Sequence, residues 1–254
     1  MKRFLILLLC LLSLSCASRS RRAQRQRDVR AYTTEERSLE ASSATERAAQ
    51  SGRRASGTHS TPTSSRREMS GSEIFKKYAP AVFRVYVSGG YKSAQGSGFF
   101  ISRDGIAVSN YHVFEGTTKG YEQIVLNDGT TCKVEHVYHY SKEQDFIIFK
   151  VAICNEVSYI PLASSSPLVG ERVYTIGSPR ELHNTFSSGE VSQLRDGGDI
   201  IQINAPIDHG SSGGVLLNSY GEAIGITSSG YEDSPANLNF AINISIIKPY
   251  IPRI

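Results

Sequence analysis

The sequence lacks a hydrophobic run long enough to cross a membrane as a helix. Its longest apolar stretch, residues 4–15, follows Met1-Lys2-Arg3 and holds 12 residues, whereas a spanning helix needs about 20. A basic start followed by a short apolar run is typical of an export signal. We therefore expect an exported protein with a signal segment over residues 1–17.

Two ways of processing this signal stay open. The residues "LSLSC" resemble a bacterial lipoprotein box, in which the cysteine, here Cys16, is lipidated and becomes the new amino terminus. Ser13 stands where leucine is usual, so ordinary cleavage after Ala17 is the alternative. The lipoprotein interpretation is favoured, and it predicts a lipid tether to a membrane with no helix crossing it. The expected location is the bacterial periplasm, or a membrane surface to which the lipoprotein is attached.

Large apolar side chains are almost absent from residues 18–70. This segment consists mainly of Arg, Ser, Ala, Thr, Glu and Gln, a composition that cannot offset the entropy of ordering by burial. It is predicted to be a disordered linker. The folded domain is then expected over residues 71–254.

A basic surface is also missing from the predicted folded domain. Residues 1–70 hold 14 of the 28 Lys and Arg residues and 6 of the 24 Asp and Glu residues, so they carry +8 and the remainder carries −4. A mildly acidic domain is not expected to bind nucleic acid. The basic segment is better interpreted as a solvated tether.

Cysteine is scarce, and only Cys132 and Cys154 follow the predicted signal. They flank a predicted hairpin, where an exported protein can form a disulfide; two buried thiols are the equal alternative. His136 and His139 lie in a strand pattern, and their odd spacing directs them to opposite faces. No metal site and no cofactor are expected.

Short β-branched and aromatic segments are what the rest of the chain does contain. A capping box of Ser70 and Glu73 predicts a helix that ends before Pro80. Segments that read as strands follow in two series, separated by Gly, Asp and Asn turns. The first series is "AVFRVYV", "SGFFIS", "IAVSN", "QIVLN", "TCKVEHVYHY" and "DFIIFKVA"; the second is "ERVYTIG", "TFSSGEVSQL", "IIQINA", "GVLLNS", "EAIGITSS" and "NFAINIS". The pattern predicts an all-β protein of two packed antiparallel barrels or sandwiches.

Three polar residues stand beside these segments in an order that suggests nucleophilic catalysis. Ser212 lies in the small-residue turn Gly210–Gly214, His112 follows "IAVSNY", and Asp145 opens "DFIIFKVA". A serine hydroxyl needs a base to take its proton, and the base needs a group that orients it. The histidine and aspartate fall on the first barrel and the serine on the second, so the active site is expected in the cleft between them.

The blocks "GSGFFIS", "VSNYHVFEG", "DFIIFKV", "YTIGSP", "SSGEVS", "IDHGSSGGVLLNSYGEAIGI" and "NFAINIS" resemble, in this order, those of HtrA/Deg-type trypsin-like serine proteases. The resemblance covers nearly all of residues 72–250. It implies two six-stranded barrels of the trypsin-like (chymotrypsin) fold, a polypeptide substrate and no cofactor. His112 is then the general base, Asp145 orients it, and the backbone N–H groups of Gly210 and Ser212 form the oxyanion hole. Proteins of this type are often trimers, but no trimer contact can be read here and the oligomeric state stays open.

Two departures from the family pattern alter what is expected. Ser211 stands where the family commonly has Asn, and His209 where it has Pro; His209 is interpreted as an exposed loop side chain, with substrate contact or pH sensing as the alternative. Only 11 residues follow Asn243. The family's usual PDZ domain does not fit there, so we expect a protease domain that stands alone.

The primary specificity pocket is predicted from family position. It comprises Pro206, Thr227, Ser228, Ser229, Gly230, Asn239, Phe240 and Ala241. None is charged, so cleavage after small or medium uncharged residues is expected rather than after Lys or Arg.

The sequence is compatible with two functions. The first is an exported serine endopeptidase that hydrolyses unfolded or exposed polypeptide through Ser212, His112 and Asp145. The second is a catalytically latent binding or adaptor domain, tethered to the membrane, in which the oxyanion hole is collapsed. The first is favoured because a binding protein has no physical need to keep all three residues together.

Overall fold

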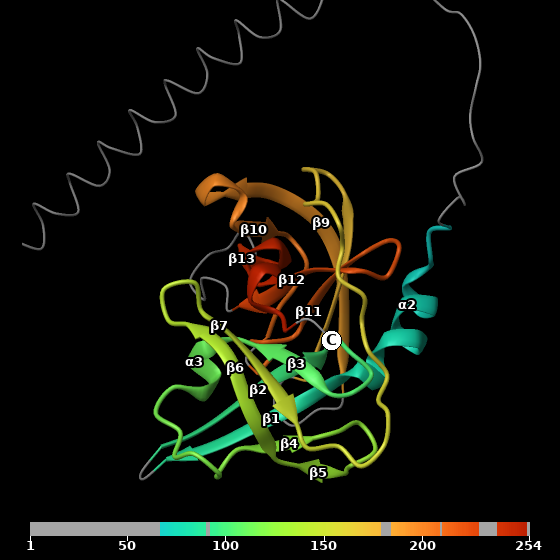
Figure 1. Ribbon diagram of the computed structural model, residues 1–254. Coiled ribbons are helices and arrows are strands. Elements are labelled where there is room, and N and C mark those ends of the chain that lie inside the picture. The colour runs from blue at the N-terminus through green and yellow to red at the C-terminus, as the bar shows by residue number, and fades with distance from the viewer. Residues whose placement is uncertain (1–66, 90–91, 179–183, 209, 229–237, 253–254) are drawn as a thin grey trace, which may run out of the picture. The chain divides into compact units, whose positions relative to one another are not determined.

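Two antiparallel β-sheets form the framework of the chain that the structure describes (Figure 1). This computed structural model describes residues 67–89, 92–178, 184–208, 210–228 and 238–252. All of them belong to one compact unit, Ser64–Ile254. The predicted signal, Cys16 and the predicted linker up to residue 66 lie outside the described residues. Among the described helices, none has the length and apolar character needed to span a bilayer.

Helix α2 (Gly71–Tyr78) begins where the sequence predicts it. Ser70 Oγ accepts a hydrogen bond from the backbone N–H of Glu73, and the Glu73 carboxylate accepts one from the Ser70 N–H at 2.8 Å. This reciprocal pair is the predicted capping box. Pro80 then turns the chain into a short 3-10 helix, η1 (Ala79–Ala81). Because Ile74 and Tyr78 are buried, the helix is packed onto the sheets by its apolar face.

Contacts with the folded unit begin inside the predicted linker. The Met69 N–H donates to the Ser219 carbonyl at 2.8 Å, and the Met69 side chain packs against the buried core. Arg67 forms an ion pair with Glu73, with 2.6 Å between Nη2 and Oε1. Residues 67–70 are therefore bound to the folded unit.

The first sheet has seven strands in the order β5-β4-β1-β2-β3-β7-β6. They are β1 (Val82–Gly89), β2 (Lys92–Phe100), β3 (Ile106–Ser109), β4 (Gln123–Val125), β5 (Thr131–Cys132), β6 (Val134–Ser141) and β7 (Phe146–Val151). Six strands were expected. The segment predicted as one strand is divided at Lys133, because β5 pairs with β4 whereas β6 pairs with β7.

The second sheet is a closed barrel in the order β10-β13-β12-β11-β8-β9. Its six strands are β8 (Arg172–Gly177), β9 (Thr185–Arg195), β10 (Ile200–Ile203), β11 (Val215–Asn218), β12 (Ala223–Ser228) and β13 (Asn239–Asn243). Four more one-turn elements are described: α3 (Tyr111–Phe114) after β3, η3 (Asp196–Gly198) after β9, and η4 (Ile244–Ile246) with η5 (Lys248–Tyr250) at the end. The curled first sheet and the closed second barrel confirm the predicted all-β, two-barrel trypsin-like fold.

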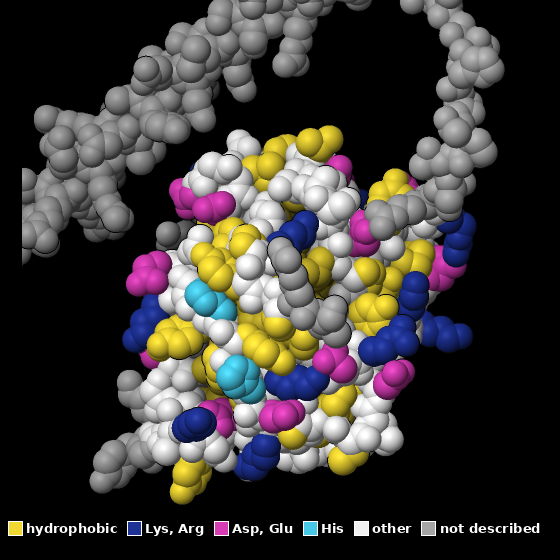
Figure 2. All heavy atoms as spheres, viewed as in Figure 1, with side chains coloured by type: hydrophobic (Ala, Val, Ile, Leu, Met, Phe, Trp, Pro, Cys, Tyr) yellow, Lys and Arg dark blue, Asp and Glu magenta, His cyan; other side chains and the backbone are white. Residues whose placement is uncertain are grey.

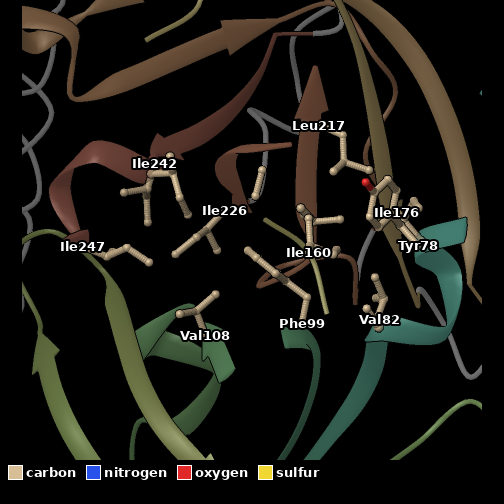
Figure 3. Close-up of a cluster of buried hydrophobic side chains, with 14 of the residues drawn as sticks. Tyr78, Val82, Phe99, Val108, Ile160, Ile176, Leu217, Ile226, Ile242 and Ile247 are labelled. Carbon is tan, nitrogen blue, oxygen red and sulfur yellow. The ribbon is translucent and has the colours of Figure 1, made fainter. Parts of the chain in front are cut away.

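Three clusters of buried apolar side chains hold this arrangement together. One fills the first sheet, around Phe83 and Phe149, and one fills the second barrel, around Ile201 and Leu216. The third joins the two. In Figure 3, Phe99 and Val108 from the first sheet lie toward Ile226 and Ile242 from the second. Since burial of apolar area stabilises by about 25 cal/mol per Å², this shared cluster fixes one barrel against the other.

Charged side chains of both signs are interspersed on the face seen in Figure 2. Both remaining cysteines are free thiols, Cys132 buried and Cys154 exposed. Burial, and after it the neighbouring Cys154, raises the pKa of Cys132. The structure thus has neither the disulfide nor the pair of buried thiols that the sequence left open.

His136 and His139 both lie in strand β6, as expected, and they have different partners. The His136 ring contacts Tyr138 edge-on, with 4.9 Å between ring centroids, and the His139 ring stacks on Tyr250 at 3.9 Å. Over the ranges that the structure describes, no group of three or more His, Cys, Asp or Glu side chains is placed to hold a metal ion.

Candidate active site

His112 lies in α3, a single helical turn that starts directly after strand β3. Strand β3 is entirely buried between β2 and β7, so its end is held firmly. Asn110, at the N-cap position, is itself fully buried. The turn therefore presents the His112 side chain from the rim of the first sheet, where 42% of that side chain is exposed.

Asp145 stands at the start of strand β7, beside the end of β3. Its carboxylate contacts His112 twice: Oδ1 accepts the backbone N–H at 2.8 Å, and Oδ2 lies 2.8 Å from ring atom Nδ1. Its carbonyl oxygen accepts hydrogen bonds from the Tyr111 N–H and from Asn110 Nδ2. Asp145 has a φ of 54°, in the left-handed region that few residues other than glycine adopt. Four hydrogen bonds thus hold a strained residue and the histidine in one geometry.

Ser212 lies in the turn that precedes strand β11 of the second barrel. Two neighbours, Gly210 and Gly213, have φ values of 89° and 86°, which glycine adopts without steric cost. The Ser211 N–H donates to the Asp208 carbonyl, and the Gly214 N–H donates to the Ser211 carbonyl. The small residues of the turn therefore allow the backbone to wind tightly and to form these two hydrogen bonds. This is the physical reason why the turn holds so many of them.

Gly96 in strand β2 brings the histidine turn and the serine turn close together. A Cβ atom at this position would lie 2.6 Å from Val113 Cγ1 and 3.1 Å from the Ser212 carbonyl oxygen. Val113 follows His112 directly. The Ser97 N–H also donates to the Ser212 carbonyl at 2.8 Å. The serine turn of the second barrel is thus seated on strand β2 of the first, beside the histidine turn.

The serine hydroxyl and the histidine ring are not hydrogen-bonded to each other. Among the described residues, no such bond joins Ser212 Oγ to His112, although His112 and Asp145 are joined as the sequence predicts. In structures without substrate, catalytic hydrogen bonds are often long and tighten only when substrate is bound. The two predicted oxyanion donors, the N–H groups of Gly210 and Ser212, likewise donate to no other group within the described part of the chain.

The predicted specificity residues fall into separate environments. Thr227 is buried and its Oγ1 donates to the Ser211 carbonyl; Asn239 is buried and its Nδ2 donates to the Ala205 carbonyl. Pro206 is exposed, and its carbonyl accepts a hydrogen bond from Ser187 Oγ. Ser229 and Gly230 lie outside the described residues, as does His209.

Ser228, Phe240 and Ala241 line a cleft between the two barrels. This cleft has a volume of about 530 Å³ and is also lined by Asp145. Its other lining residues are Glu143, Gln144, Arg195, Asp196, Ile200, Gln202, Leu238 and Ile242. The cleft therefore reaches Asp145 from the side of the second barrel, and both apolar and charged residues line it.

Aromatic side chains border the histidine on the first sheet. Tyr111 stacks on Tyr140 with 5.2 Å between ring centroids, and Lys142 Nζ lies 5.3 Å from the Tyr111 ring centroid. Interaction with the Tyr111 hydroxyl raises the pKa of Lys142. The Lys142 ammonium therefore keeps its positive charge at neutral pH, beside Tyr111, the residue that precedes His112.

Ser97 and Asn110 are site residues that sequence reasoning missed. Both are fully buried, and each touches a predicted catalytic segment through a hydrogen bond. The only sequence signal was their position: Ser97 lies inside the block "GSGFFIS" and Asn110 inside "VSNYHVFEG". Which buried polar residue contacts which loop depends on the packing of distant segments.

The fold is that of a trypsin-like peptidase. A family model described as "Trypsin-like peptidase domain" matches residues 96–226, which is more than half of the chain. The chain belongs to this family. Within it, the relatives found are of the HtrA and DegP type, which confirms the resemblance drawn from the sequence blocks.

Three relatives show the extent of the similarity. The chain is 33% identical over 199 residues to serine protease HTRA1A of Danio rerio, an alignment that covers 70% of this chain and 40% of that protein. It is 34% identical over 167 residues to a probable periplasmic serine endoprotease DegP-like of Rhizobium meliloti (strain 1021), with 62% and 32% covered. The crystal structure of the serine endoprotease from Yersinia pestis matches with a TM-score of 0.64 and 27% identity, over 71% of this chain and 65% of that one. The chain spans about 40% of the length of the first curated relatives it matches.

Proposed function

We propose that this protein is a serine endopeptidase that hydrolyses peptide bonds of unfolded or exposed polypeptides. Ser212 is the nucleophile, His112 the general base, and Asp145 the group that orients the base. The observation that carries the proposal is the double contact of the Asp145 carboxylate with the His112 backbone and ring. That contact supports a proton on Nδ1, shared with the Asp145 carboxylate, and it leaves Nε2 as the ring atom that faces the serine proton.

The reaction proceeds in two steps, acylation and then deacylation of Ser212. Ser212 Oγ attacks the substrate carbonyl carbon while its proton passes to His112 Nε2, and the carbonyl oxygen becomes an oxyanion. When the C–N bond breaks, the same proton passes to the leaving amine and an ester with Ser212 remains. In the second step a water molecule attacks the ester carbonyl while its proton passes to His112 Nε2. The proton then returns to Ser212 Oγ as the ester bond breaks, and the carboxylic acid product leaves. Asp145 stabilises the charged imidazolium in both steps.

Backbone N–H groups of Gly210 and Ser212 are proposed to bind the oxyanion. Each such donor is worth about 3 to 4 kcal/mol of transition-state stabilisation. Their lack of partners among the described residues supports this role, and so does the turn geometry around Gly210. Its φ is 89°, which glycine adopts without steric cost, and the Ser211 N–H donates a hydrogen bond to the Asp208 carbonyl.

Labelling with a fluorophosphonate probe tests this proposal directly. The intact mass of the full chain after incubation is expected to rise by one adduct. Ser212→Ala should abolish the adduct and His112→Ala should slow its formation at least a hundredfold, because each variant removes one member of the nucleophile and base pair. Casein hydrolysis by the same preparations provides the matching activity measurement.

The latent adaptor is the competing function, and the absence of a hydrogen bond between Ser212 and His112 is the observation in its favour. A folded wild type that forms no adduct and cleaves no casein would support it and overturn the endopeptidase. An adduct that survives Ser212→Ala would also contradict the proposal, since the reactive serine would lie elsewhere.

Export and membrane attachment are a separate part of the proposal. The basic and apolar start of the chain supports export, and Cys16 is the proposed site of lipidation. A lipid on Cys16 would place the domain at a membrane surface through a segment of 50 residues, residues 17–66. Polypeptides that reach that surface are then the substrates.

A further inference from the structure

Ser97 occupies a position in which one side chain touches both barrels. It lies in strand β2 of the first sheet, opposite Arg84 in β1, and is fully buried. Its hydroxyl donates to the Gly210 carbonyl at 2.8 Å and accepts the Ser178 N–H at 2.9 Å. Both of those partners belong to the second-barrel part of the chain. A hydroxyl has one proton to donate, so the Ser178 contact leaves that proton directed at Gly210.

The backbone of Ser97 contacts the same turn. Its N–H donates to the Ser212 carbonyl at 2.8 Å, and its carbonyl accepts the Ser109 hydroxyl at 2.7 Å. The serine turn is therefore held by Ser97 at two points, on either side of Ser211. Gly210, with no side chain, has more rotational freedom than Ser211 or Ser212, so its orientation depends on an anchor from outside.

We propose that Ser97 is a positioning residue for oxyanion binding, whose hydroxyl holds the Gly210 carbonyl and thereby fixes the backbone that carries the Gly210 and Ser212 N–H groups. This inference rests on the proposed function of the site. Within the described part of the chain, Ser97 forms no hydrogen bond with His112. Its effect passes through the turn. Holding the Gly210 carbonyl fixes the peptide plane between Gly210 and Ser211, and that plane limits the rotations of Gly210 and Ser211 that orient the neighbouring planes, which carry the Gly210 and Ser212 N–H groups.

Removing the hydroxyl isolates this effect. In Ser97→Ala, the Gly210 carbonyl and the Ser178 N–H lose their partner while the backbone bond to Ser212 remains. Misplacement of catalytic groups by about 1 Å costs on the order of a hundredfold in rate. We therefore expect the maximal rate of fluorophosphonate labelling to fall about tenfold to a hundredfold, with the half-saturating probe concentration unchanged. Ser97→Cys, which keeps a weak donor, should give an intermediate rate.

The pH profile separates oxyanion positioning from general damage. The pH dependence of wild-type labelling reports on the general base of the site. Because Ser97 has no contact with His112 or Asp145, Ser97→Ala should lower the plateau of this profile and leave its midpoint in place. A shifted midpoint would mean that the variant disturbs the base, and that result would overturn the proposal.

Ser102 provides a matched control. It is also a buried serine of the first sheet, and its hydroxyl likewise accepts a backbone N–H, that of Ile106 at 3.0 Å, while donating to Asp104. It lies in the turn between β2 and β3 and contacts no residue of the serine turn. Ser102→Ala should reduce the urea unfolding midpoint as much as Ser97→Ala while labelling at the wild-type rate.

The outcomes distinguish this inference from the proposed function. Wild-type labelling together with unchanged labelling of Ser97→Ala overturns the role of Ser97 and leaves the endopeptidase standing. Equal loss of rate in Ser97→Ala and Ser102→Ala also overturns it, since the effect would then be one of stability. A wild type that does not label overturns both.

Discussion

Single residues set the distances in this site, and Gly96 is the clearest case. The absence of a side chain lets Val113 and the Ser212 carbonyl approach the same point on strand β2. An added methyl group in such packed surroundings forces side chains or backbone to shift, typically at a cost of about 1 to 3 kcal/mol. Here the shift falls on the turns that carry His112 and Ser212.

Gly96→Ala is therefore expected to reduce fluorophosphonate labelling at least tenfold. The nearest atoms to the new Cβ are the two methyl groups of Val113, at 2.6 and 2.7 Å. Adding Val113→Ala removes both of them, so the double variant should label faster than Gly96→Ala alone. Labelling rates of the two single variants and the double variant form the measurement. If the losses of labelling rate in the two single variants simply add in the double variant, the methyl groups of Val113 are not what the new Cβ displaces, and this explanation is wrong.

Sequence reasoning at the residue scale identified His112 and Asp145 as partners but not how they are held. Each follows from a local signal, the end of one predicted strand and the start of another. The φ of 54° at Asp145 leaves no such signal. Aspartate adopts the left-handed region only occasionally, so the presence of an aspartate in the sequence does not predict it. Hydrogen bonds from Asn110 and Tyr111 to the Asp145 carbonyl stabilise it, and those partners are more than 30 residues away.

Among the elements, helix α2 links the start of the described chain to the packed core. Its buried residues, Ile74 and Tyr78, belong to the cluster that joins the two barrels. Phe75 contacts Phe186 of β9 edge-on, with 5.7 Å between ring centroids. The stability of this one helix thus bears on the whole unit.

Loss of the capping box is expected to lower the free energy of unfolding. Ser70→Ala removes the side-chain acceptor for the Glu73 N–H, and an N-cap serine is worth about 1 kcal/mol. Urea unfolding at pH 7, followed by circular dichroism, measures the difference. Ser72→Ala is the control, because it removes a hydroxyl that lies 3.1 Å from Ser70 Oγ but leaves both hydrogen bonds of the box in place. An equal loss there would show that the cap has no special role.

The pH dependence of this cap follows from Glu73. The side chain of Arg67 and, after it, the N–H and hydroxyl of Ser70 lower the pKa of Glu73 from 4.5 to about 2. A carboxylate whose pKa is lower in the folded state stabilises that state above its ordinary pKa, and the contribution is lost as the pH falls from 4.5 towards 2. The stability difference between wild type and Glu73→Gln should thus be smaller at pH 3 than at pH 7 in the same unfolding measurement. A stability difference that does not change with pH would contradict the lowered pKa of Glu73.

At the scale of the whole molecule, two barrels share one buried cluster and the proposed site lies between them. The chain enters this unit through residues 67–70, which bind beside the turn between β11 and β12. Glu68 accepts a hydrogen bond from the Tyr220 hydroxyl at 3.4 Å. A tether attached to the preceding residues would therefore pull on the second barrel rather than on the first.

Lipidation at Cys16 is the prediction that belongs to this scale. When the full chain is produced in bacteria with an alkyne analogue of palmitate, the protein should take up the label and partition into the detergent phase. Cys16→Ala should abolish both properties, since a thioether-linked lipid needs that sulfur. Cys10→Ala, which changes the other cysteine of the signal, should keep them. An unlabelled wild type whose amino terminus begins at Ser18 would instead establish ordinary cleavage after Ala17.

The sequence by itself determined the class of fold and the three proposed catalytic residues. Strand periodicity, turn residues and the capping box are local properties, and each is expressed within a few neighbouring positions. The chain order of His112, Asp145 and Ser212 needed only that these segments form two barrels. The helix start at Ser70 was predicted on the same ground, whereas the strand pattern left barrels or sandwiches open and the family resemblance implied the barrels.

Only the tertiary structure decided how those residues are supported. The division of the first sheet at Lys133, the seating of the serine turn on Gly96 and Ser97, and the separation of Thr227 and Asn239 from the cleft residues all depend on contacts between distant segments. Such contacts are fixed by the packing of two sheets through a shared apolar core. A buried hydroxyl or a missing side chain acquires its role from what that packing places beside it, and no local pattern in the sequence records it.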